Sequence, residues 1–522
     1  MALQSEQQDP PSETGSPPGP RTVEQNTRSS YEATPYSVNA FPQTHPDRLA
    51  TVARLFGIQS PHPDRCRVLE LGCASGGNLI PMALGSPESR FVGIDLSGGQ
   101  IADGLAVVRE LGLRNIDLNE ASILDIGSDF GEFDYILAHG VFSWVPAPVQ
   151  AKILDICRRH LSARGVAYIS YNTYPGWHAR AALREMLWYH TARFSDPAER
   201  VQQARALLAF LAKFMPHADG SYGSLVRQEL MLLLVTPDSY LLHEHLDEIN
   251  EPLYFHQFAQ RAAANGLQYL GEAQIGMMSP ARFGAQTETM LRHISPDLLH
   301  MEQYMDFLRN RMFRQTLLCH QSMTVDHALR PEALQDLYIS SSAKPAVTEG
   351  DFDNAEAQTF SGPGQQKLTT RDPLMRAAMT LLVENAPSSL HFEELTREAR
   401  RRCGRTEARS DNDAEEERQL ATRLLNCSLS SLVEFSIAPS KFVVNISDEP
   451  VASPYARLRA RTGGKITNLR LETVPLEEPA RQLLSHLDGQ HNHQQLCSIM
   501  NQPLATVAEL LELFAQSALL IA

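Results

Sequence analysis

Two carboxylates flank a short glycine-rich segment in the first fifth of the chain. Glu70 lies two positions before Gly72, in a segment that reads Glu-Leu-Gly-Cys-Ala-Ser-Gly-Gly-Asn from 70 to 78, and Asp95 follows in Gly-Ile-Asp. A turn with few large side chains lets the backbone approach a ligand closely. A carboxylate can accept two hydrogen bonds from adjacent hydroxyl groups, such as those of a ribose. The spacing therefore predicts a binding site for a ribose-bearing ligand beside an acidic group.

The elements that must position these residues follow a regular alternation. Strands are predicted at 67–71, 90–95, 116–122, 133–138 and 165–171, with helical segments at 78–84, 101–111 and 149–161 between them. Strands that alternate with helices indicate right-handed crossovers and a parallel, doubly wound sheet of the α/β class. Ligands bind such sheets at the carboxyl ends of the strands, where the strand order reverses. We therefore expect the glycine-rich turn and Asp95 to share one site.

Two kinds of adenosine-bearing cofactor fit this arrangement of residues. A dinucleotide site favours Gly-x-Gly-x-x-Gly, whereas Gly72, Ala74 and Gly77 form Gly-x-Ala-x-x-Gly, and Glu70 lies awkwardly for a pyrophosphate. S-adenosylmethionine carries an ammonium and a sulfonium group and no phosphate, so an acidic group beside the turn favours it. The sequence thus predicts methyl transfer over nucleotide-dependent redox chemistry. A glycine turn that binds nothing is the remaining alternative.

The segments 68–78 and 93–97 resemble the fingerprint of class I methyltransferases, which have a Rossmann-like sheet. Further segments at 31–50, 138–146 and 170–177 resemble bacterial methyltransferases that bear a methyltransferase regulatory domain, a subfamily that includes the outer-membrane-protein lysine methyltransferases. The likeness extends over most of the chain from residue 31. It implies an S-adenosylmethionine-dependent enzyme that methylates lysine side chains of proteins. The alternatives are a small-molecule or natural-product methyltransferase and a regulatory protein that binds the cofactor without turnover.

The resemblance also implies which residues contact the cofactor. At the methionine end they are Glu70, Gly72, Ala74 and Gly76, with Cys73 and Asn78 in the same loop; Asp95 contacts the ribose, and Leu96, Ser122, Ile123 and His139 complete the set. Ser122 stands where related enzymes often carry an aspartate for the adenine amino group. Ala74 replaces a common glycine, which is compatible with a negative φ at this position.

Candidate residues on the acceptor side follow the fourth and fifth strands. His139 and Trp144 follow the fourth strand, Tyr174 follows the fifth, and Tyr36 precedes the core, where it is expected to fold over the cofactor. Aromatic faces suit a cationic acceptor, although each of these aromatics also fits ordinary core packing. His139 is a candidate base or a residue that hydrogen-bonds the backbone. The sequence His-Gly-Val-Phe after the fourth strand differs from the Asn/Asp-Pro-Pro-aromatic tetrad of enzymes that methylate amide or base nitrogens.

Composition limits the partners and the compartment. The net charge of −15 disfavours a general nucleic-acid binder and favours a cationic substrate. No segment of about 18 apolar residues is present, so no membrane span is predicted, and the first residues lack the pattern of a secretory signal. The seven cysteines form no Cys-x-x-Cys pair, which is typical of reduced thiols in a cytoplasmic protein. We predict no metal site, and composition does not determine the oligomeric state.

The chain divides by composition into five parts. These are a polar, disordered tail (1–30), a methyltransferase core with a helical insertion at about 178–250 (31–280), a helical regulatory region (281–340), a linker (341–371) and a mainly helical, winged-helix-like module (372–522). Helix is predicted to continue through 298–318. In the last module we expect three helices and then a β pair that ends near 441–447, with the charged segment 406–418 as a loop.

Overall fold

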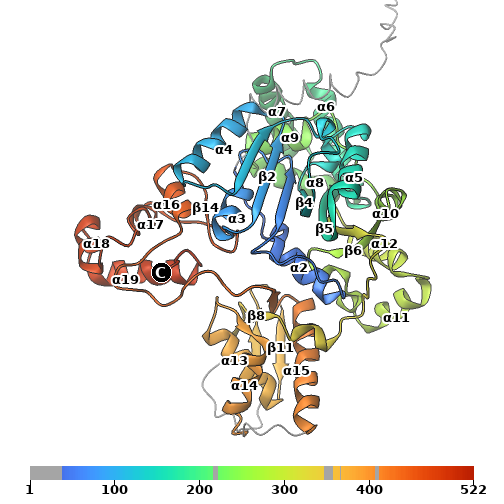
Figure 1. Ribbon diagram of the computed structural model, residues 1–522. Coiled ribbons are helices and arrows are strands. Elements are labelled where there is room, and N and C mark those ends of the chain that lie inside the picture. Colours follow the sequence, from blue (N-terminus) through green and yellow to red (C-terminus); the bar gives the residue numbers. More distant parts are fainter. Residues whose placement is uncertain (1–37, 216–220, 346–356, 365, 406–410) are drawn as a thin grey trace, which may run out of the picture.

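The computed structural model describes residues 38–215, 221–345, 357–364, 366–405 and 411–522; the predicted tail and Tyr36 lie outside this part (Figure 1). At the centre is a seven-stranded sheet in the order β3-β2-β1-β4-β5-β7-β6. Its strands are β1 (Arg67–Leu71), β2 (Arg90–Asp95), β3 (Ile116–Glu120), β4 (Phe133–Ala138), β5 (Leu161–Asn172), β6 (Leu267–Glu272) and β7 (Phe313–His320). The strand order reverses between β1 and β4, as expected for a doubly wound sheet.

The predicted α/β, Rossmann-like class is confirmed, but the sheet is mixed. β7 runs antiparallel to both β5 and β6. The prediction of helix through 318 is therefore wrong: α12 (Leu298–Arg309) is capped by Asn310, which has a left-handed φ of 49°, and the chain re-enters the sheet. A short apolar segment fits a buried strand as well as a helix, and here strand pairing on both sides decides between them.

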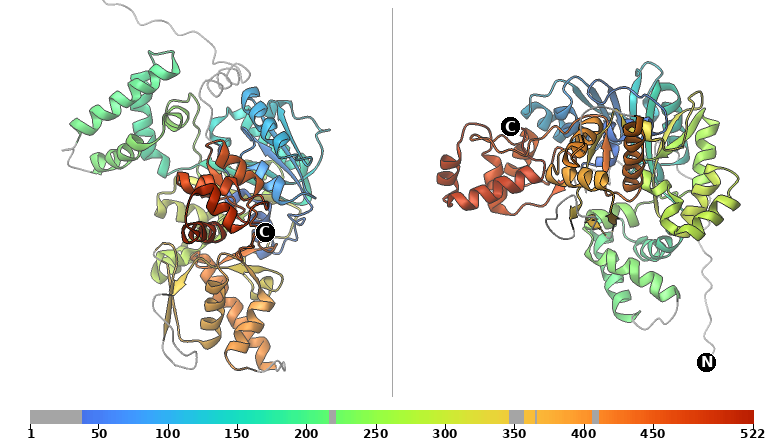
Figure 2. Two further views of the ribbon diagram at one scale, coloured as in Figure 1. Left: turned by 90° about the vertical axis from the view of Figure 1, so that its left-hand side faces the viewer. Right: turned by 90° about the horizontal axis from the view of Figure 1, so that it is seen from below.

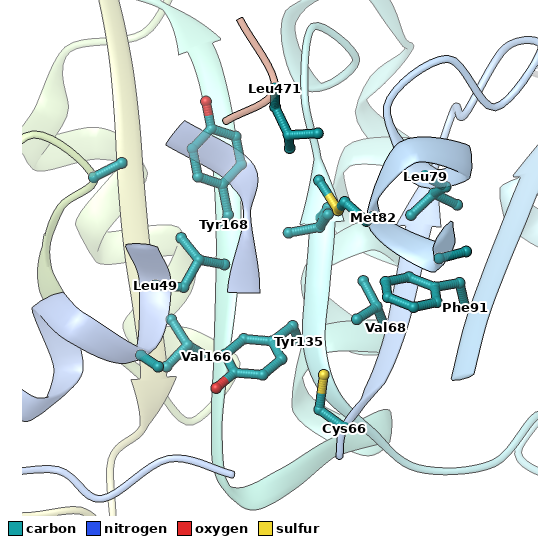
Figure 3. Close-up of a cluster of buried hydrophobic side chains, with 14 of the residues drawn as sticks. Leu49, Cys66, Val68, Leu79, Met82, Phe91, Tyr135, Val166, Tyr168 and Leu471 are labelled. Carbon is teal, nitrogen blue, oxygen red and sulfur yellow. The ribbon is translucent and has the colours of Figure 1, made fainter. Parts of the chain in front are cut away.

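Helices cover both faces of the sheet. They are α2 (Pro46–Leu55), α3 (Leu79–Gly85), α4 (Gly98–Glu110), α5 (Ala147–His160) and α10 (Phe255–Ala264). Successive strand residues point to opposite faces, so Val68 belongs to the hydrophobic cluster that contains Leu79 and Phe91, whereas Leu69 belongs to the one that contains Ile153 (Figure 3). The sheet is therefore buried on both sides, which holds the turns at its carboxyl edge in place.

A helical unit with its own core follows β5. It consists of α6 (Gly176–Thr191), α7 (Pro197–Phe214), α8 (Ser221–Val235) and α9 (Asp238–His245). Leu183, Leu208, Leu230 and Leu241 form its buried cluster, and Figure 2 shows these helices projecting from the rest of the molecule. They occupy the segment in which the sequence predicts an insertion. No helix in the described ranges is both long and apolar enough to cross a bilayer.

The part predicted as a linker contains strands. β9 (Lys344–Pro345), β10 (Gln358–Ser361) and β11 (Lys367–Thr370) form an antiparallel sheet, and Phe360 is buried. α11 (Ala285–Ile294) and β8 (Tyr338–Ser340) precede it. The prediction of a linker is therefore wrong for the described residues of this part, because polar β-branched residues such as Thr359 and Thr369 pair across strands while Phe360 reaches a core.

The C-terminal module contains two hydrophobic cores, where the sequence predicts one. The first includes α13 (Pro373–Glu384), β12 (Leu390–His391), α14 (Phe392–Arg402), α15 (Asp411–Leu429) and β13 (Glu434–Ser436). The second includes α16 (Pro454–Arg461), β14 (Ile466–Thr467), β15 (Thr473–Val474), α17 (Glu478–Ser485), α18 (His493–Met500) and α19 (Leu504–Gln516). Two local predictions are wrong: β13 pairs with β8 and no strand forms at 441–447, and 411–418 belongs to α15.

Candidate cofactor and acceptor site

A cavity of about 700 Å³ lies at the carboxyl edge of the sheet, where the strand order reverses. Cavities that bind small molecules typically have about 300–1,000 Å³. Its wall is formed by the turn after β1, the end of β2, the loops after β3 and β4, and helices α6 and α9 of the insertion. A segment before α2, which we call the N-terminal strap (38–44), one residue of the C-terminal module, the end of β5 and the start of β7 also contribute to the wall.

The carboxylate of Glu70 is buried in this wall. Its Oε1 accepts a hydrogen bond from Asn78 Nδ2 at 2.9 Å, whereas Oε2 has no hydrogen-bond partner among the described residues. Burial raises the pKa of Glu70 to about 7, and the negative charge of Asp95 adds to the effect. A buried oxygen without a donor is costly. An ammonium group in the cavity would satisfy it, so this side chain fits the methionine end of S-adenosylmethionine.

Asp95 links the end of β2 to the turn after β1. Its Oδ2 accepts a hydrogen bond from the backbone N–H of Ala74 at 2.8 Å, and its Oδ1 accepts one from Ser97 at 2.9 Å. Each oxygen retains a lone pair for a ribose hydroxyl. Ala74 has φ of 51°, so the expected negative value is wrong. The hydrogen bond to Asp95 holds this left-handed conformation, which an alanine adopts only at a cost.

The predicted cofactor residues do not all reach the cavity. Those in the wall are Glu70, Gly72, Cys73, Ala74, Asn78, Asp95, Leu96, Ile123 and His139. Gly76 has φ of 71° and packs close to Leu118, so it shapes the turn from behind. Ser122 Oγ accepts a hydrogen bond from the Leu124 N–H at 3.1 Å, which caps the turn that carries Ile123. Neither Gly76 nor Ser122 is part of the wall, but each of them positions neighbouring residues that line the cavity.

The acceptor side contains an aromatic group around His139. The ring of His139 lies 3.9 Å from that of Phe41 and 6.1 Å from that of Phe313 between centroids. Its Nδ1 lies 2.9 Å from the hydroxyl oxygen of Tyr168. Burial lowers the pKa of His139 to about 4, so the imidazole is neutral at physiological pH. A neutral ring does not repel a cationic acceptor.

Trp144 and Tyr174 differ in their position. Trp144 lines the cavity and packs edge-on against Trp177 with ring centroids 6.1 Å apart. Tyr174 lies beside the cavity and outside its wall, stacked on His178 at 4.1 Å and close to Tyr254. The structure therefore brings His139 and Trp144 together at the cavity but not Tyr174.

Several residues of the wall carried no signal in the sequence. Phe313 and Met312 line the cavity from the start of β7, a segment that local periodicity assigns to a helix. Lys465 reaches the cavity from the C-terminal module, and 426 positions separate it from its hydrogen-bond partner Asn39. Asn172 is the exception, since its place at the end of β5 follows from the strand order.

The fold and the site together define an S-adenosylmethionine-dependent methyltransferase of class I. Comparisons with known proteins agree: residues 69–167 match the family described as "Methyltransferase domain", 237–320 match "Predicted methyltransferase regulatory domain" and 448–519 match "PKMT, C-terminal winged helix domain". The third match coincides with the second of the two C-terminal cores. The predictions of fold class, enzyme class and cofactor are confirmed.

The likeness to PKMT proteins extends over nearly the whole chain. PKMT2 from Rickettsia typhi, solved in complex with AdoHcy, has a TM-score of 0.83 and 30% identity, and the match covers 94% of this chain and 100% of that one. The uncharacterized protein RP789 of Rickettsia prowazekii is 35% identical over 476 residues, which is 89% of this chain and 84% of the relative. The chain therefore belongs to the PKMT family of methyltransferases.

Proposed function

We propose that this methyltransferase acts on lysine side chains of a protein substrate. The observation that carries the proposal is the match over 94% of the chain to PKMT2, whose abbreviation denotes a protein lysine methyltransferase. The chain's net charge of −15 supports the proposal, because an acidic protein attracts a lysine-bearing partner at long range.

The acceptor side of the cavity fits a lysine. When bound, S-adenosylmethionine supplies a methyl group on a sulfonium, and the residues around it must align an acceptor nitrogen that has a free lone pair. A lysine ammonium has an ordinary pKa of about 10.4, and enclosure among apolar side chains lowers that pKa. Trp144, Trp177 and Phe313 provide such an enclosure, and their ring faces attract the ammonium as it enters. His139 is the candidate hydrogen-bond partner of the nitrogen.

The residue roles follow from the same cavity. We propose Glu70 and Asn78 at the methionine end, Asp95 at the ribose, and Leu96 and Ile123 at the adenine. Gly72, Cys73 and Ala74 form the turn between them. Gly76 and Ser122 act by shaping the turns next to the cavity, and Tyr174 has no contact with it. We also propose a cytoplasmic location, because all seven cysteines are free thiols.

Methyl transfer from radiolabelled S-adenosylmethionine tests the proposal. The full-length protein is incubated with a bacterial lysate, and in parallel with the same lysate after acetylation of its lysines. We expect label on protein in the first reaction only, with Asp95→Asn as the inactive control. Label that persists on acetylated protein, or that appears only in the small-molecule extract, would refute a lysine acceptor. No label in any fraction would instead favour a cofactor-binding regulator.

A further inference from the structure

The winged-helix domain contributes one side chain to the cofactor cavity. Lys465, between α16 and β14, lines the wall, and its Nζ donates a hydrogen bond to Asn39 Oδ1 at 2.8 Å. Asn39 belongs to the N-terminal strap, which lies directly on Gly77: a Cβ at Gly77 would clash with Val38 and with the backbone of Asn39. Lys465 and the glycine-rich turn therefore both adjoin the same strap and line the same cavity.

The position of Lys465 is set by packing on both sides of it. Ile466, its neighbour, is fully buried in the core of the winged-helix domain. Leu471, a few residues later, is buried in the core of the central sheet, where Figure 3 shows it near Met82. Figure 1 shows α16 and β14 beside α3 and α4. The domain is thus attached to the sheet at the segment that carries Lys465.

The negative charges around the cavity favour a cation near the expected methionine end of the cofactor. Glu70 and Asp95 are both carboxylates, and the methionine end of S-adenosylmethionine carries a further carboxylate beside its ammonium. Within the described part of the wall, the cationic side chains are Arg180 and Lys465. Arg180 belongs to the insertion, where its Nε lies 2.5 Å from Glu229 and its guanidinium lies over the Trp177 ring. Lys465 instead adjoins the strap over the turn where the methionine end is expected.

We propose that Lys465 binds the carboxylate of the cofactor's methionine end, so that the winged-helix domain is part of the cofactor site. The ammonium of Lys465 forms a charge-assisted hydrogen bond to this carboxylate, which offsets the repulsion from Glu70 and Asp95. The inference rests on the methyltransferase class and is independent of which acceptor the enzyme uses. It predicts that the domain affects cofactor affinity before any protein substrate is present.

Two ligands that differ at the methionine end test this assignment in the full-length protein. S-adenosylhomocysteine has the amino-acid carboxylate, whereas 5′-methylthioadenosine shares the adenosine and the sulfur but lacks it. For Lys465→Met we expect calorimetry to show an affinity for S-adenosylhomocysteine that is lower by about tenfold or more, and an affinity for 5′-methylthioadenosine that is unchanged within about twofold. Lys465→Arg keeps the positive charge. We therefore expect this variant to retain most of the difference in affinity that the wild-type protein shows between the two ligands.

The matched control is Arg461→Met, which removes a cation from the same domain. Arg461 forms an exposed ion pair with Glu110 of α4 at 3.1 Å and lies outside the cavity wall, so neither affinity should change. The proposal is wrong if Lys465→Met lowers the affinity for both ligands equally or lowers the affinity for neither of them. Thermal melting of each variant shows whether it is folded. A wild-type protein that binds neither ligand would refute the cofactor assignment itself, which is a separate failure.

Discussion

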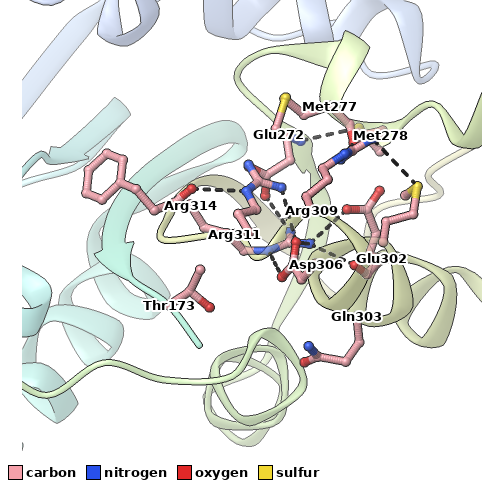
Figure 4. Close-up of polar contacts among 12 residues, drawn as sticks. Thr173, Glu272, Met277, Met278, Glu302, Gln303, Asp306, Arg309, Arg311 and Arg314 are labelled. Carbon is pink, nitrogen blue, oxygen red and sulfur yellow. Dashed lines mark hydrogen bonds and ion pairs between the residues drawn. The ribbon is translucent and has the colours of Figure 1, made fainter. Parts of the chain in front are cut away.

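Two groups of buried carboxylates in this protein differ in how their charge is balanced. Behind β7, Arg314 contacts all three carboxylates of one group: Nη1 lies 2.7 Å from Glu272, Nη2 2.9 Å from Glu302 and Nε 2.7 Å from Asp306, and Arg311 adds a second guanidinium (Figure 4). In the cavity, Glu70 and Asp95 are hydrogen-bonded only to an amide side chain and to backbone N–H groups among the described residues.

The difference distinguishes a structural site from a binding site. Arg311 and Arg314 lower the pKa of Glu272 even though burial opposes them. At Glu302 burial outweighs the two arginines and raises the pKa to about 7, as burial also does at Glu70. In the first group every carboxylate contacts a guanidinium group of the protein, and Arg314 ties the group to β7, the strand that begins with the cavity residue Phe313. In the second group neither carboxylate has a hydrogen bond to a cationic side chain among the described residues, which leaves room for contact with the cofactor's ammonium. A raised carboxylate pKa alone therefore does not distinguish the two groups; what distinguishes them is the guanidinium contact that the first group has and the second does not.

Removal of the Arg314 guanidinium should have the largest effect, a decrease in the free energy of unfolding. In Arg314→Met the three carboxylates keep only Arg311 as a close cation, and breaking a buried pair on one side costs about 3–5 kcal/mol. We expect the free energy of unfolding in urea to fall by about this amount. Arg292→Met, which breaks the exposed pair with Glu288, should cost less than about 1 kcal/mol. Similar losses in the two variants would mean that the cluster contributes no more than a surface pair.

Neutralising the cavity carboxylate should act on binding and not on folding. In Glu70→Gln the acceptor for Asn78 is kept and the charge is lost. We expect the affinity for S-adenosylmethionine to fall by about 10- to 100-fold, as for a lost charged hydrogen bond of about 1.5–3 kcal/mol. The melting temperature should stay the same or rise, because an unbalanced buried charge is removed. Calorimetry measures the affinity, and thermal melting measures the melting temperature. A lower melting temperature with unchanged affinity would show that Glu70 stabilises the fold and does not bind the cofactor.

The affinity of the wild-type protein should also depend on pH. The folded pKa of Glu70, about 7, lies above its ordinary value, so the free protein carries a proton on this group below pH 7. Binding of an ammonium requires its release, so affinity should rise by up to about tenfold per pH unit between pH 5.5 and 7. The cofactor's amino group, with a pKa of about 7.7–8.0, stays protonated in this range, and His45 and His139, with pKa values of about 4, stay neutral. Glu70→Gln should show a flat profile.

The smallest expected effect concerns the turn between the two carboxylates. In Ala74→Gly the left-handed backbone loses its steric cost, so the free energy of unfolding should rise by up to about 1 kcal/mol, offset in part by the greater freedom of glycine in the unfolded chain. Ala106→Gly, in the exposed face of α4, should instead lose about 1 kcal/mol. A decrease in the free energy of unfolding in both variants would show that the backbone of Ala74 is not strained.

The parts of the site that the sequence predicts are local. Glu70, the turn after it and Asp95 lie within two neighbouring strands, and their alternating pattern is enough to place them at one edge of a sheet. Strand β7 was missed because four apolar residues suit a helix or a buried strand equally well. The φ of Ala74 was also missed, since it depends on a hydrogen bond to a residue on the next strand.

By itself the sequence determined the class of the protein, because the chemistry of the cofactor is met by residues close together in the chain. Only the tertiary structure decided which distant side chains complete the cavity. Phe313 and Lys465 reach it from β7 and from the winged-helix domain, and both positions depend on packing between segments far apart in sequence. Local patterns record which face of an element is apolar, but not which partner that face will meet.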